Sequence, residues 1–217
     1  MNKSFYFLIA FLVIVCLSIL SGCKVDGQNN PVSKDSLKSL YGYNETDLAK
    51  FQNRVNKTIE QSRIKKSKAI IIDKMRYELL LIDSGEIDTI FNVELGRDPI
   101  SDKFHEDGRT TPEGFYKVSR KLNIGQTSFY KALYVNYPNE LDRHEYDSLK
   151  SIGAIEKGIG IGGQIEIHGC GSGKKGNEGG YNWTLGCIAL SNKDMDYLFE
   201  KVKVNTPITI VKYKEEL

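Results

Sequence analysis

The chain has 217 residues, of which 40% are hydrophobic and 10% aromatic, which suits one globular domain with an additional N-terminal segment. Its 30 basic and 28 acidic side chains give a net charge of +2, and no basic stripe stands out beyond Lys65-Lys66, so we expect no nucleic-acid partner. Four cysteines are too few and too irregularly spaced for a secreted disulfide scaffold, so the fold must depend on its apolar core.

The first 22 residues have the pattern of a bacterial secretion signal. Lys3 provides a positive start, residues 5–19 are almost entirely apolar, and Leu20-Ser21-Gly22-Cys23 resembles the lipobox of bacterial lipoproteins. We therefore predict that residues 1–22 are a lipoprotein signal peptide and that Cys23 carries the lipid. The alternative is an uncleaved transmembrane anchor, because the apolar run is nearly long enough to cross a bilayer.

Both interpretations place the rest of the chain in the cell envelope, attached to a membrane and facing the periplasm or the outside. Lys24 follows Cys23, where an Asp would indicate retention in the inner membrane, so we expect the outer membrane if the cell has two. Cys16 would leave with the signal peptide, and Cys170 and Cys187 would then be the thiols of the mature domain.

A polar stretch and a helical pattern follow. Residues 23–35 are rich in polar residues and include glycine and proline, which predicts a flexible tether. Residues 36–66 are predicted to be helical, with start signals at Thr46-Asp47 and apolar residues at three- and four-residue steps, namely Leu48, Phe51, Val55 and Ile59. We expect this apolar face to pack on the following domain; a partner-binding coiled coil is the alternative, but the pattern covers too few heptads to favour it.

From Ala69 onward the apolar pattern becomes that of β-strands. Residues 69–73 and 78–82 flank a turn at Lys74-Met75-Arg76, and Ser84-Gly85 marks a second turn before residues 86–95. A loop punctuated by glycine and proline then leads into residues 115–118. This meander of short strands predicts a mainly β (α+β) fold, an antiparallel β-sandwich or open barrel with a few helices.

A histidine and a cysteine at strand ends carry the strongest functional signal. His168 ends the alternating apolar run 164–168, and Cys187 opens another strand, 187–190, after a glycine-rich loop. Two neighbouring strand ends can bring an imidazole beside a thiol. An imidazole that takes or shares the thiol proton makes cysteine a nucleophile near neutral pH.

The surrounding motifs resemble the L,D-transpeptidase catalytic domain, the YkuD-type family of peptidoglycan enzymes. The family signature is a His, about fifteen variable residues, and Ser/Thr-x-Gly-Cys, which His168 and residues 184–187 reproduce. Residues 109–116 are similar to the family's Thr-Pro-x-Gly-x-Phe/Tyr element, and further matches are a stretch at 137–142, a capped helix at 191–199 and a turn into a strand at 205–210. The resemblance covers residues 67–213, which we predict to be the catalytic domain.

The resemblance implies roles for individual residues. Cys187 would be the nucleophile and His168 the general base, with the backbone carbonyl of Gly169 orienting the imidazole. Gly186 would let the chain turn so that backbone N–H groups around Gly186 and Cys187 point at the oxyanion.

Four further residues are candidates for substrate binding. Arg109 would meet a substrate carboxylate, although loop solvation is an equally good interpretation. Asn182 and Trp183 precede the motif and would belong to a rim that stacks against a peptide or sugar, and Thr184 stands in the Thr-x-Gly-Cys motif itself. An aromatic residue beside a strand start is also typical of a core position, so that interpretation of Trp183 stays open.

The function implied is an L,D-transpeptidase that forms a Cys thioester with a peptidoglycan stem peptide and transfers it to an amine. Many family members have a second His where this chain has Leu185, and an Arg where it has Ala189. A hydrolase of the same fold, either an L,D-carboxypeptidase or an amidase on peptidoglycan-linked peptides, is therefore the alternative. A non-catalytic envelope module that binds stem peptides is a further one.

A metal centre is the rival chemistry for this region. His168, Cys170 and Cys187 could supply three ligands, but a structural zinc needs four, usually with Cys-x-x-Cys spacing, which this sequence lacks. We therefore predict no metal and no cofactor.

Overall fold

The computed structural model describes residues 45–170, 182–213 and 217. The described residues belong to one compact unit, Asn44–Leu217. The predicted signal peptide, Cys23, the tether and the start of the helical segment lie outside the described residues. Within the described part of the chain, no helix is long and apolar enough to cross a membrane.

Eight strands form one sheet in the order β3-β2-β1-β8-β4-β5-β6-β7. Five of its pairings are antiparallel, and the β1–β8 and β6–β7 pairings are parallel. The mainly β fold predicted from the sequence is therefore confirmed. The strands are β1 Lys68–Asp73, β2 Glu78–Asp83, β3 Glu86–Asn92, β4 Gly114–Leu122, β5 Ala132–Val135, β6 Glu166–Gly169, β7 Ile188–Leu190 and β8 Pro207–Val211.

The two ends of the sheet are joined by backbone hydrogen bonds. After β3, the Glu94 N–H donates to the Ala189 carbonyl at 2.9 Å, and the Ala189 N–H donates back to Glu94 at 2.8 Å. Gly96 forms a further bridge to Thr184. The sheet therefore curls into a nearly closed barrel, and this closure brings the chain after β3 against the segment that carries Cys187.

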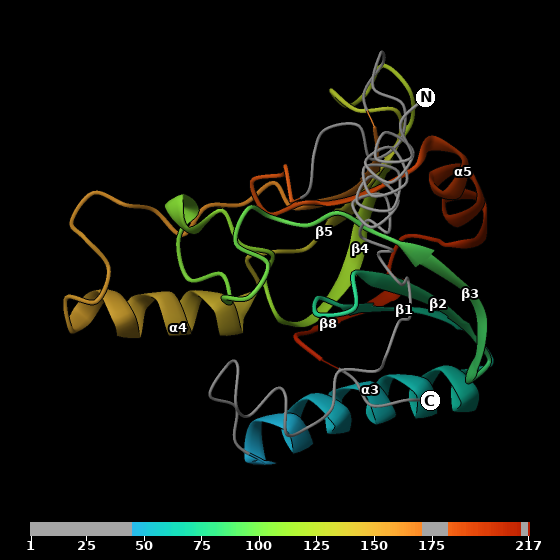
Figure 1. Ribbon diagram of the computed structural model, residues 1–217, viewed down its shortest axis with the longest axis horizontal. Helices are drawn as coiled ribbons and strands as arrows, with labels where there is room; N and C mark the ends of the chain where they lie inside the picture. The colour runs from blue at the N-terminus through green and yellow to red at the C-terminus, as the bar shows by residue number, and fades with distance from the viewer. Residues whose placement is uncertain (1–44, 171–181, 214–216) are drawn as a thin grey trace, which may run out of the picture. The chain divides into compact units, whose positions relative to one another are not determined.

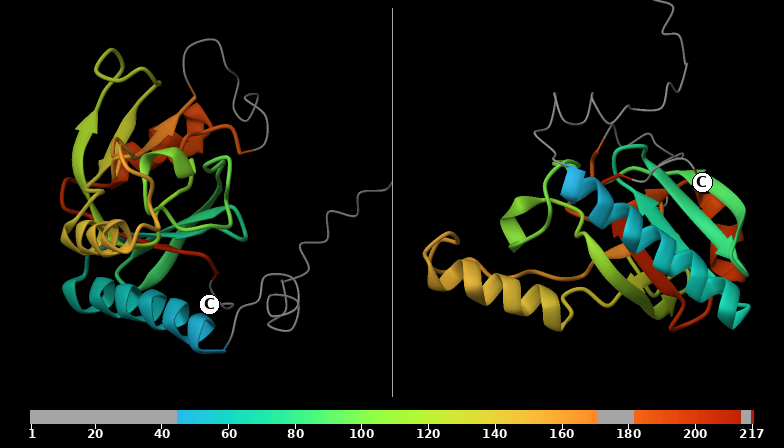
Figure 2. Two further views of the ribbon diagram at one scale, coloured as in Figure 1. Left: turned by 90° about the vertical axis from the view of Figure 1, so that its left-hand side faces the viewer. Right: turned by 90° about the horizontal axis from the view of Figure 1, so that it is seen from below.

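The N-terminal helical segment is confirmed as α3, Glu45–Lys65, which lies along β1, β2 and β8 (Figures 1 and 2). Its buried face includes Leu48, Phe51 and Val55, and the Thr58 hydroxyl meets the Thr209 hydroxyl at 2.6 Å. Strands β1 and β2 read as unbroken apolar runs because one face lines the barrel core and α3 covers the other.

Two shorter helices and a 3₁₀ turn complete the fold. Helix α4, Glu140–Ser151, begins with a capping box between Asn139 and Asp142, and α5, Asn192–Lys201, begins at Ser191, whose hydroxyl accepts from the Asp194 N–H. Helix α5 packs against β5 and β6. The 3₁₀ turn η1, Glu106–Gly108, lies in the long loop between β3 and β4.

Candidate active site

His168 is held in one orientation by its own backbone. The ring lies on β6 and is fully buried, and its Nδ1 is 2.8 Å from the Gly169 carbonyl oxygen. Because a carbonyl oxygen can only accept, Nδ1 carries the proton and Nε2 presents its lone pair. Nε2 is buried and has no hydrogen-bond partner among the described residues. The orienting contact expected from the sequence is confirmed, and it leaves Nε2 available as a base.

Cys187 lies at the end of the neighbouring strand, on the same face of the sheet as His168. In the parallel pairing of β6 and β7, His168 lies opposite Ala189 and Ile167 lies opposite Ile188. Extended by one residue, the same register sets Glu166 opposite Cys187. The Glu166 N–H donates to the Cys187 Sγ at 3.4 Å, in agreement with that register. Since side chains two residues apart share a face, the thiol and the imidazole lie on one side of β6 and β7.

Burial keeps both groups neutral in the resting site. Loss of hydration lowers the pKa of His168 to about 4, and it raises the pKa of the Cys187 thiol to about 11. The thiolate expected from the sequence is therefore a minor species near neutral pH. A neutral imidazole beside a neutral thiol can still accept the thiol proton while the sulfur attacks, as a general base does.

The turn before Cys187 requires a glycine. Gly186 has φ +129°, and a Cβ there would lie 2.5 Å from the Thr110 carbonyl oxygen. The Thr184 hydroxyl accepts from the Gly186 N–H at 3.2 Å and donates to the Cys187 carbonyl at 2.7 Å. The Gly186 N–H is thus already bonded inside the turn. The other oxyanion donor expected from the sequence is the Cys187 N–H.

The predicted substrate-binding residues divide into several groups. Thr184 is buried, and its hydroxyl is used in the turn, so its contacts indicate that it shapes the loop rather than touching substrate. Asn182 is anchored by its N–H to Glu94 and by its amide to the Tyr77 hydroxyl. Arg109 is exposed and ends η1 in the left-handed region at φ 51°.

Trp183 belongs to an aromatic group around the imidazole. Phe129 stacks on His168 with ring centroids 3.5 Å apart, and Trp183 meets His168 edge-on at 5.7 Å. Phe129 was not predicted from the sequence, because it follows a polar loop with no strand or helix pattern to place it. These rings exclude water from one side of the imidazole, in accord with its lowered pKa.

A hollow of about 550 Å³ adjoins the pair. It includes Gln164, whose carbonyl oxygen is 3.5 Å from the Cys187 Sγ, and Glu166. The Glu166 carboxylate accepts from the Thr127 hydroxyl, and burial raises its pKa. The lining residues are Arg120, Leu122, Gly125, Gln126, Thr127, Ser128, Phe129, Tyr134, Gln164 and Glu166. Cys187 and His168 do not line this hollow themselves, and its volume can hold a small peptide.

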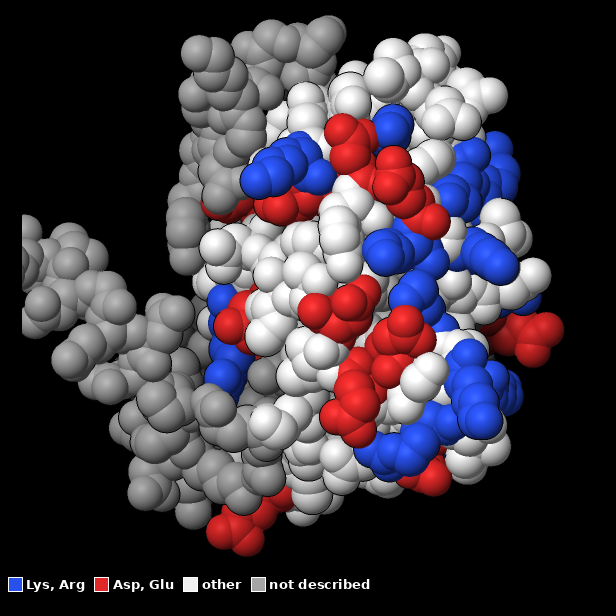
Figure 3. Space-filling model, turned by 90° about the vertical axis from the view of Figure 1, so that its right-hand side faces the viewer, with Lys and Arg blue, Asp and Glu red and all other residues white. Residues whose placement is uncertain are grey.

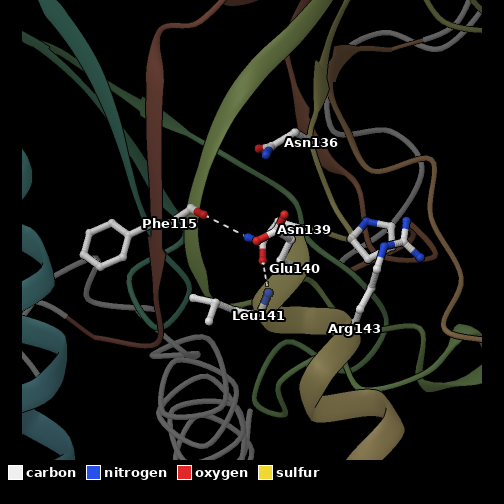
Figure 4. Close-up of a pocket in the computed structure, with 7 residues that line it drawn as sticks. Phe115, Asn136, Asn139, Glu140, Leu141 and Arg143 are labelled. Atoms are coloured by element: carbon white, nitrogen blue, oxygen red, sulfur yellow. Dashed lines mark hydrogen bonds between the residues drawn. The ribbon is translucent and has the colours of Figure 1, made fainter.

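A second hollow, of about 600 Å³, lies at the start of α4 (Figure 4). Its lining includes Asn139, whose amide donates to the Phe115 carbonyl oxygen and whose side-chain oxygen accepts from the Leu141 N–H. The first hollow is the one whose lining residues contact the pair: Gln164 and Glu166 bond to the Cys187 Sγ, and Phe129 stacks on His168. The candidate site is therefore the one at Cys187.

The other cysteine of the described domain is in a different environment. Cys170 is 1% exposed, its Sγ donates to the Leu190 carbonyl oxygen at 3.4 Å, and it forms no disulfide with Cys187. Among the described residues, no group of three or more His, Cys, Asp or Glu side chains is arranged to hold a metal ion. On the face in Figure 3, basic and acidic side chains are interspersed.

Comparison with known proteins finds a matching family. The sequence model of the L,D-transpeptidase catalytic domain, YkuD, matches residues 67–210. The chain is 26% identical over 197 residues to "Putative L,D-transpeptidase YafK" of Escherichia coli K12. That alignment covers 90% of this chain and 62% of YafK, so the chain spans less than two thirds of that relative's length.

A solved structure with a TM-score above 0.5 shows the same fold. The helical cell shape determining protein Pgp2 from Campylobacter jejuni has a TM-score of 0.51 and 24% identity, over 70% of this chain and 49% of Pgp2. An L,D-transpeptidase from Xylanimonas cellulosilytica is similar with a TM-score of 0.44 and 18% identity, over 67% of this chain and 60% of the other.

Proposed function

Because this chain belongs to the L,D-transpeptidase catalytic domain family, we propose that it is a lipid-anchored cysteine acyltransferase acting on peptidoglycan stem peptides. The observation that carries the proposal is the His168 geometry: Nδ1 is tied to the Gly169 carbonyl, and Nε2 is unoccupied on the face shared with Cys187. This arrangement supplies a nucleophile and an oriented base, which a covalent acyl transfer requires.

In the first half of the reaction, the Cys187 sulfur attacks the carbonyl of the L-centre of the diaminoacid residue. The thiol proton passes to His168 Nε2, and the Cys187 N–H donates to the oxyanion that forms. His168 then gives the proton to the departing amine of the terminal D-amino acid. The C–N bond breaks, and the tripeptide remains as a thioester on Cys187.

In the second half, an acceptor resolves the thioester. An amine that gives a proton to His168 attacks the thioester carbonyl and forms the new C–N bond. The C–S bond then breaks, and the Cys187 sulfur takes the proton back from His168, which completes an L,D cross-link. Water in the same position gives a carboxypeptidase or amidase instead. Leu185, which is 63% exposed, and Ala189, which is buried, are both apolar. Because neither offers a polar group that would favour one acceptor, hydrolysis stays the alternative outcome.

The test uses tetrapeptide muropeptides, with the products identified by mass. Wild-type protein should produce cross-linked dimers, tripeptides or both, whereas Cys187→Ala and His168→Ala should produce neither. Cys187→Ala should leave the melting temperature nearly unchanged, because only a sulfur atom is replaced. Equal turnover by wild type and Cys187→Ala would reject the covalent mechanism, and it would favour a module that only binds stem peptides.

We extend the proposal to the N-terminus, where the lipobox-like sequence supports lipid attachment at Cys23 and location in the cell envelope. Cys23→Ala should release the protein from membranes or block its processing. Membrane fractionation and intact mass distinguish the outcomes. Unchanged membrane association and unchanged mass would instead favour a spanning anchor.

A further inference from the structure

Lys103 is a buried cation in the loop that connects β3 to β4. Its side chain is almost fully covered, with 6% of the residue exposed. The ammonium donates to the His105 carbonyl oxygen at 3.1 Å and lies 5.9 Å from the centre of the Tyr137 ring. An ammonium has three N–H donors, so one carbonyl acceptor does not satisfy it.

No carboxylate of the described residues forms an ion pair with Lys103. Glu106 and Asp107 act on it only through longer-range attraction, which raises its pKa, while burial lowers it more strongly. Lysine is rarely buried without an anionic partner, because removing its charge from water is costly. The loop therefore holds a cation whose anionic partner is not supplied by the described part of the protein.

The loop fixes the position of this cation. The Lys103 N–H donates to the Asp102 carboxylate at 2.6 Å, and the same oxygen accepts from the Glu113 N–H at 2.8 Å, which ties the two ends of the segment together. Nearer its other end, the Thr110 carbonyl packs against Gly186, where an added Cβ would be 2.5 Å away. One segment thus carries Lys103 and touches the turn that holds the nucleophile.

Lys103 and Cys187 also interact electrostatically. Lys103 contributes to a lower pKa of the Cys187 thiol, and a Cys187 thiolate contributes to a higher pKa of Lys103. The thiol nevertheless keeps a pKa of about 11 because burial dominates. The buried ammonium has one carbonyl acceptor among the described residues, so a substrate group can take its remaining N–H donors.

Two more polar atoms on this loop have no partner among the described residues. They are the Thr110 hydroxyl and the His105 Nδ1, both buried. Both flank Gly108: a Cβ at that position would lie 3.2 Å from the Thr110 Oγ1 and 3.9 Å from the His105 ring. The loop therefore holds a buried cation and, near Gly108, two further polar atoms that have no partner among the described residues.

We propose that Lys103 binds the C-terminal carboxylate of the peptide substrate, one residue beyond the carbonyl that Cys187 attacks. This inference rests on the proposed function and names the feature of the substrate that the site selects. A terminal carboxylate is separated from the attacked carbonyl by a single amino acid, so a cation near the thiol is in reach of it. Lys103 would then restrict cleavage to the last residue of a chain and exclude internal peptide bonds.

The test measures binding, which separates it from turnover. In a Cys187→Ala background, we would titrate a stem tetrapeptide that ends in D-alanine, its C-terminal carboxamide, and a peptide amidated only on the side-chain carboxylate of the diaminoacid. The protein variants are Lys103 unchanged, Lys103→Met and Lys103→Arg. The control is Lys121→Met, which removes another largely covered lysine that donates to the Phe199 and Val202 carbonyls.

With Lys103 present, the terminal carboxamide should bind about 10- to 100-fold more weakly than the free acid, the range of a charge-assisted hydrogen bond. Lys103→Met should bind acid and amide equally, Lys103→Arg should restore part of the preference, and Lys121→Met should retain it. A purely structural role for Lys103 would weaken both peptides alike.

The inference is overturned if neither peptide binds, if acid and amide bind equally to the Lys103 protein, or if the preference follows the side-chain carboxylate. Failure of the proposed function gives a different result. In that case, the Lys103-dependent preference persists in binding, while wild-type protein with Cys187 intact releases no product from the same tetrapeptide.

Discussion

At the scale of single residues, the Cys187–His168 pair is a neutral couple rather than a preformed ion pair. The imidazole loses its affinity for protons because Phe129 and the sheet exclude water from it, and the thiol loses acidity for the same reason. The proton therefore moves during attack, when the developing oxyanion can be stabilised. Thiol reactivity without substrate is accordingly a poor measure of catalytic competence in this protein.

This view predicts the pH profile of alkylation. We expect the rate of Cys187 modification by iodoacetamide to keep rising beyond pH 8.5, the midpoint of an ordinary thiol, toward the pKa of about 11. At pH 7 the rate should be more than about 100-fold below that of the unfolded chain, because the thiolate fraction is smaller. Mass analysis of the Cys187 peptide measures the rate of modification. A midpoint at or below 8.5 would show that the resting site does ionise the thiol.

His168 should also make the free energy of unfolding depend on pH. Its pKa falls from 6.5 to about 4 on folding, so the unfolded chain binds the extra proton between these values. Stability is therefore full above pH 6.5 and is lost as the pH falls toward 4, by up to about 3 kcal/mol. Urea unfolding at pH 7 and pH 4 should show this additional loss in wild type relative to His168→Gln. Equal losses would mean that the buried imidazole is not the group responsible.

The catalytic roles of His168 and Cys187 stay predictions, but their places in the fold were predictable from residue type and spacing. His168 and Cys187 stood at strand ends, and the fold brings them to one face. Sequence reasoning failed for groups whose role depends on burial. Nothing in the local pattern of Lys103 distinguishes a buried cation from a solvated loop lysine, and Thr184 bonds inside its own turn, where the sequence suggested substrate.

At the scale of elements, the site depends on a contact between two loops. The turn 184–187 packs on the β3–β4 loop at Thr110, and Gly186 makes this possible because it has φ +129° and no Cβ. The strands on both sides are short, so the register of β6 and β7 alone does not fix the turn. The closeness of the two loops is what positions the Cys187 N–H.

We predict that Gly186→Ala lowers turnover of tetrapeptide by about 100-fold or more, because an added Cβ 2.5 Å from the Thr110 carbonyl oxygen must displace the turn. The matched control is Gly153→Ala, also at a positive φ, +74°, but with nothing within 4 Å of the added Cβ. Both variants should lose about 1 kcal/mol of stability from backbone strain, and the control should keep full turnover. Equal activity of the two variants would refute the loop-contact argument.

Several elements of the fold were predictable from local sequence signals. The turns at 74–76 and 84–85, the capped helix at 191–199 and the final strand were all indicated by local signals, and the structure contains them. The parallel pairing of β1 with β8 joins strands far apart in the sequence, and no local pattern encodes it. The nearly closed barrel also depends on the Glu94–Ala189 bridge, which is a tertiary contact.

At the scale of the whole molecule, a buried charged cluster connects the barrel to the β3–β4 loop. Lys74, in the turn between β1 and β2, is fully buried and donates to the Ser101 and Thr111 carbonyls at 2.7 and 2.9 Å, and to the Glu113 carboxylate at 2.9 Å. Lys212 lies 3.8 Å from the same carboxylate. All three ammonium donors are used, so the loop that carries Lys103 is fastened to the sheet.

Lys74→Met should therefore reduce both stability and turnover. Removing the cation leaves the Glu113 carboxylate buried with Lys212 alone, at a cost of about 3–5 kcal/mol. The surface pair Lys68–Asp83 supplies the control, since its side chains are 23% and 48% exposed and Lys68→Met should cost about 0–1 kcal/mol.

Urea unfolding gives the free energies, and tetrapeptide turnover is measured at a temperature at which every variant is folded. Adding Glu113→Gln to Lys74→Met should recover part of the stability, because the unpaired carboxylate is removed with its partner. Turnover should recover less, since two carbonyls of the loop still lack the ammonium that held them. If Lys74→Met and Lys68→Met lose equal stability, or if Lys74→Met keeps full turnover, the loop is positioned by its other contacts and not by this cluster.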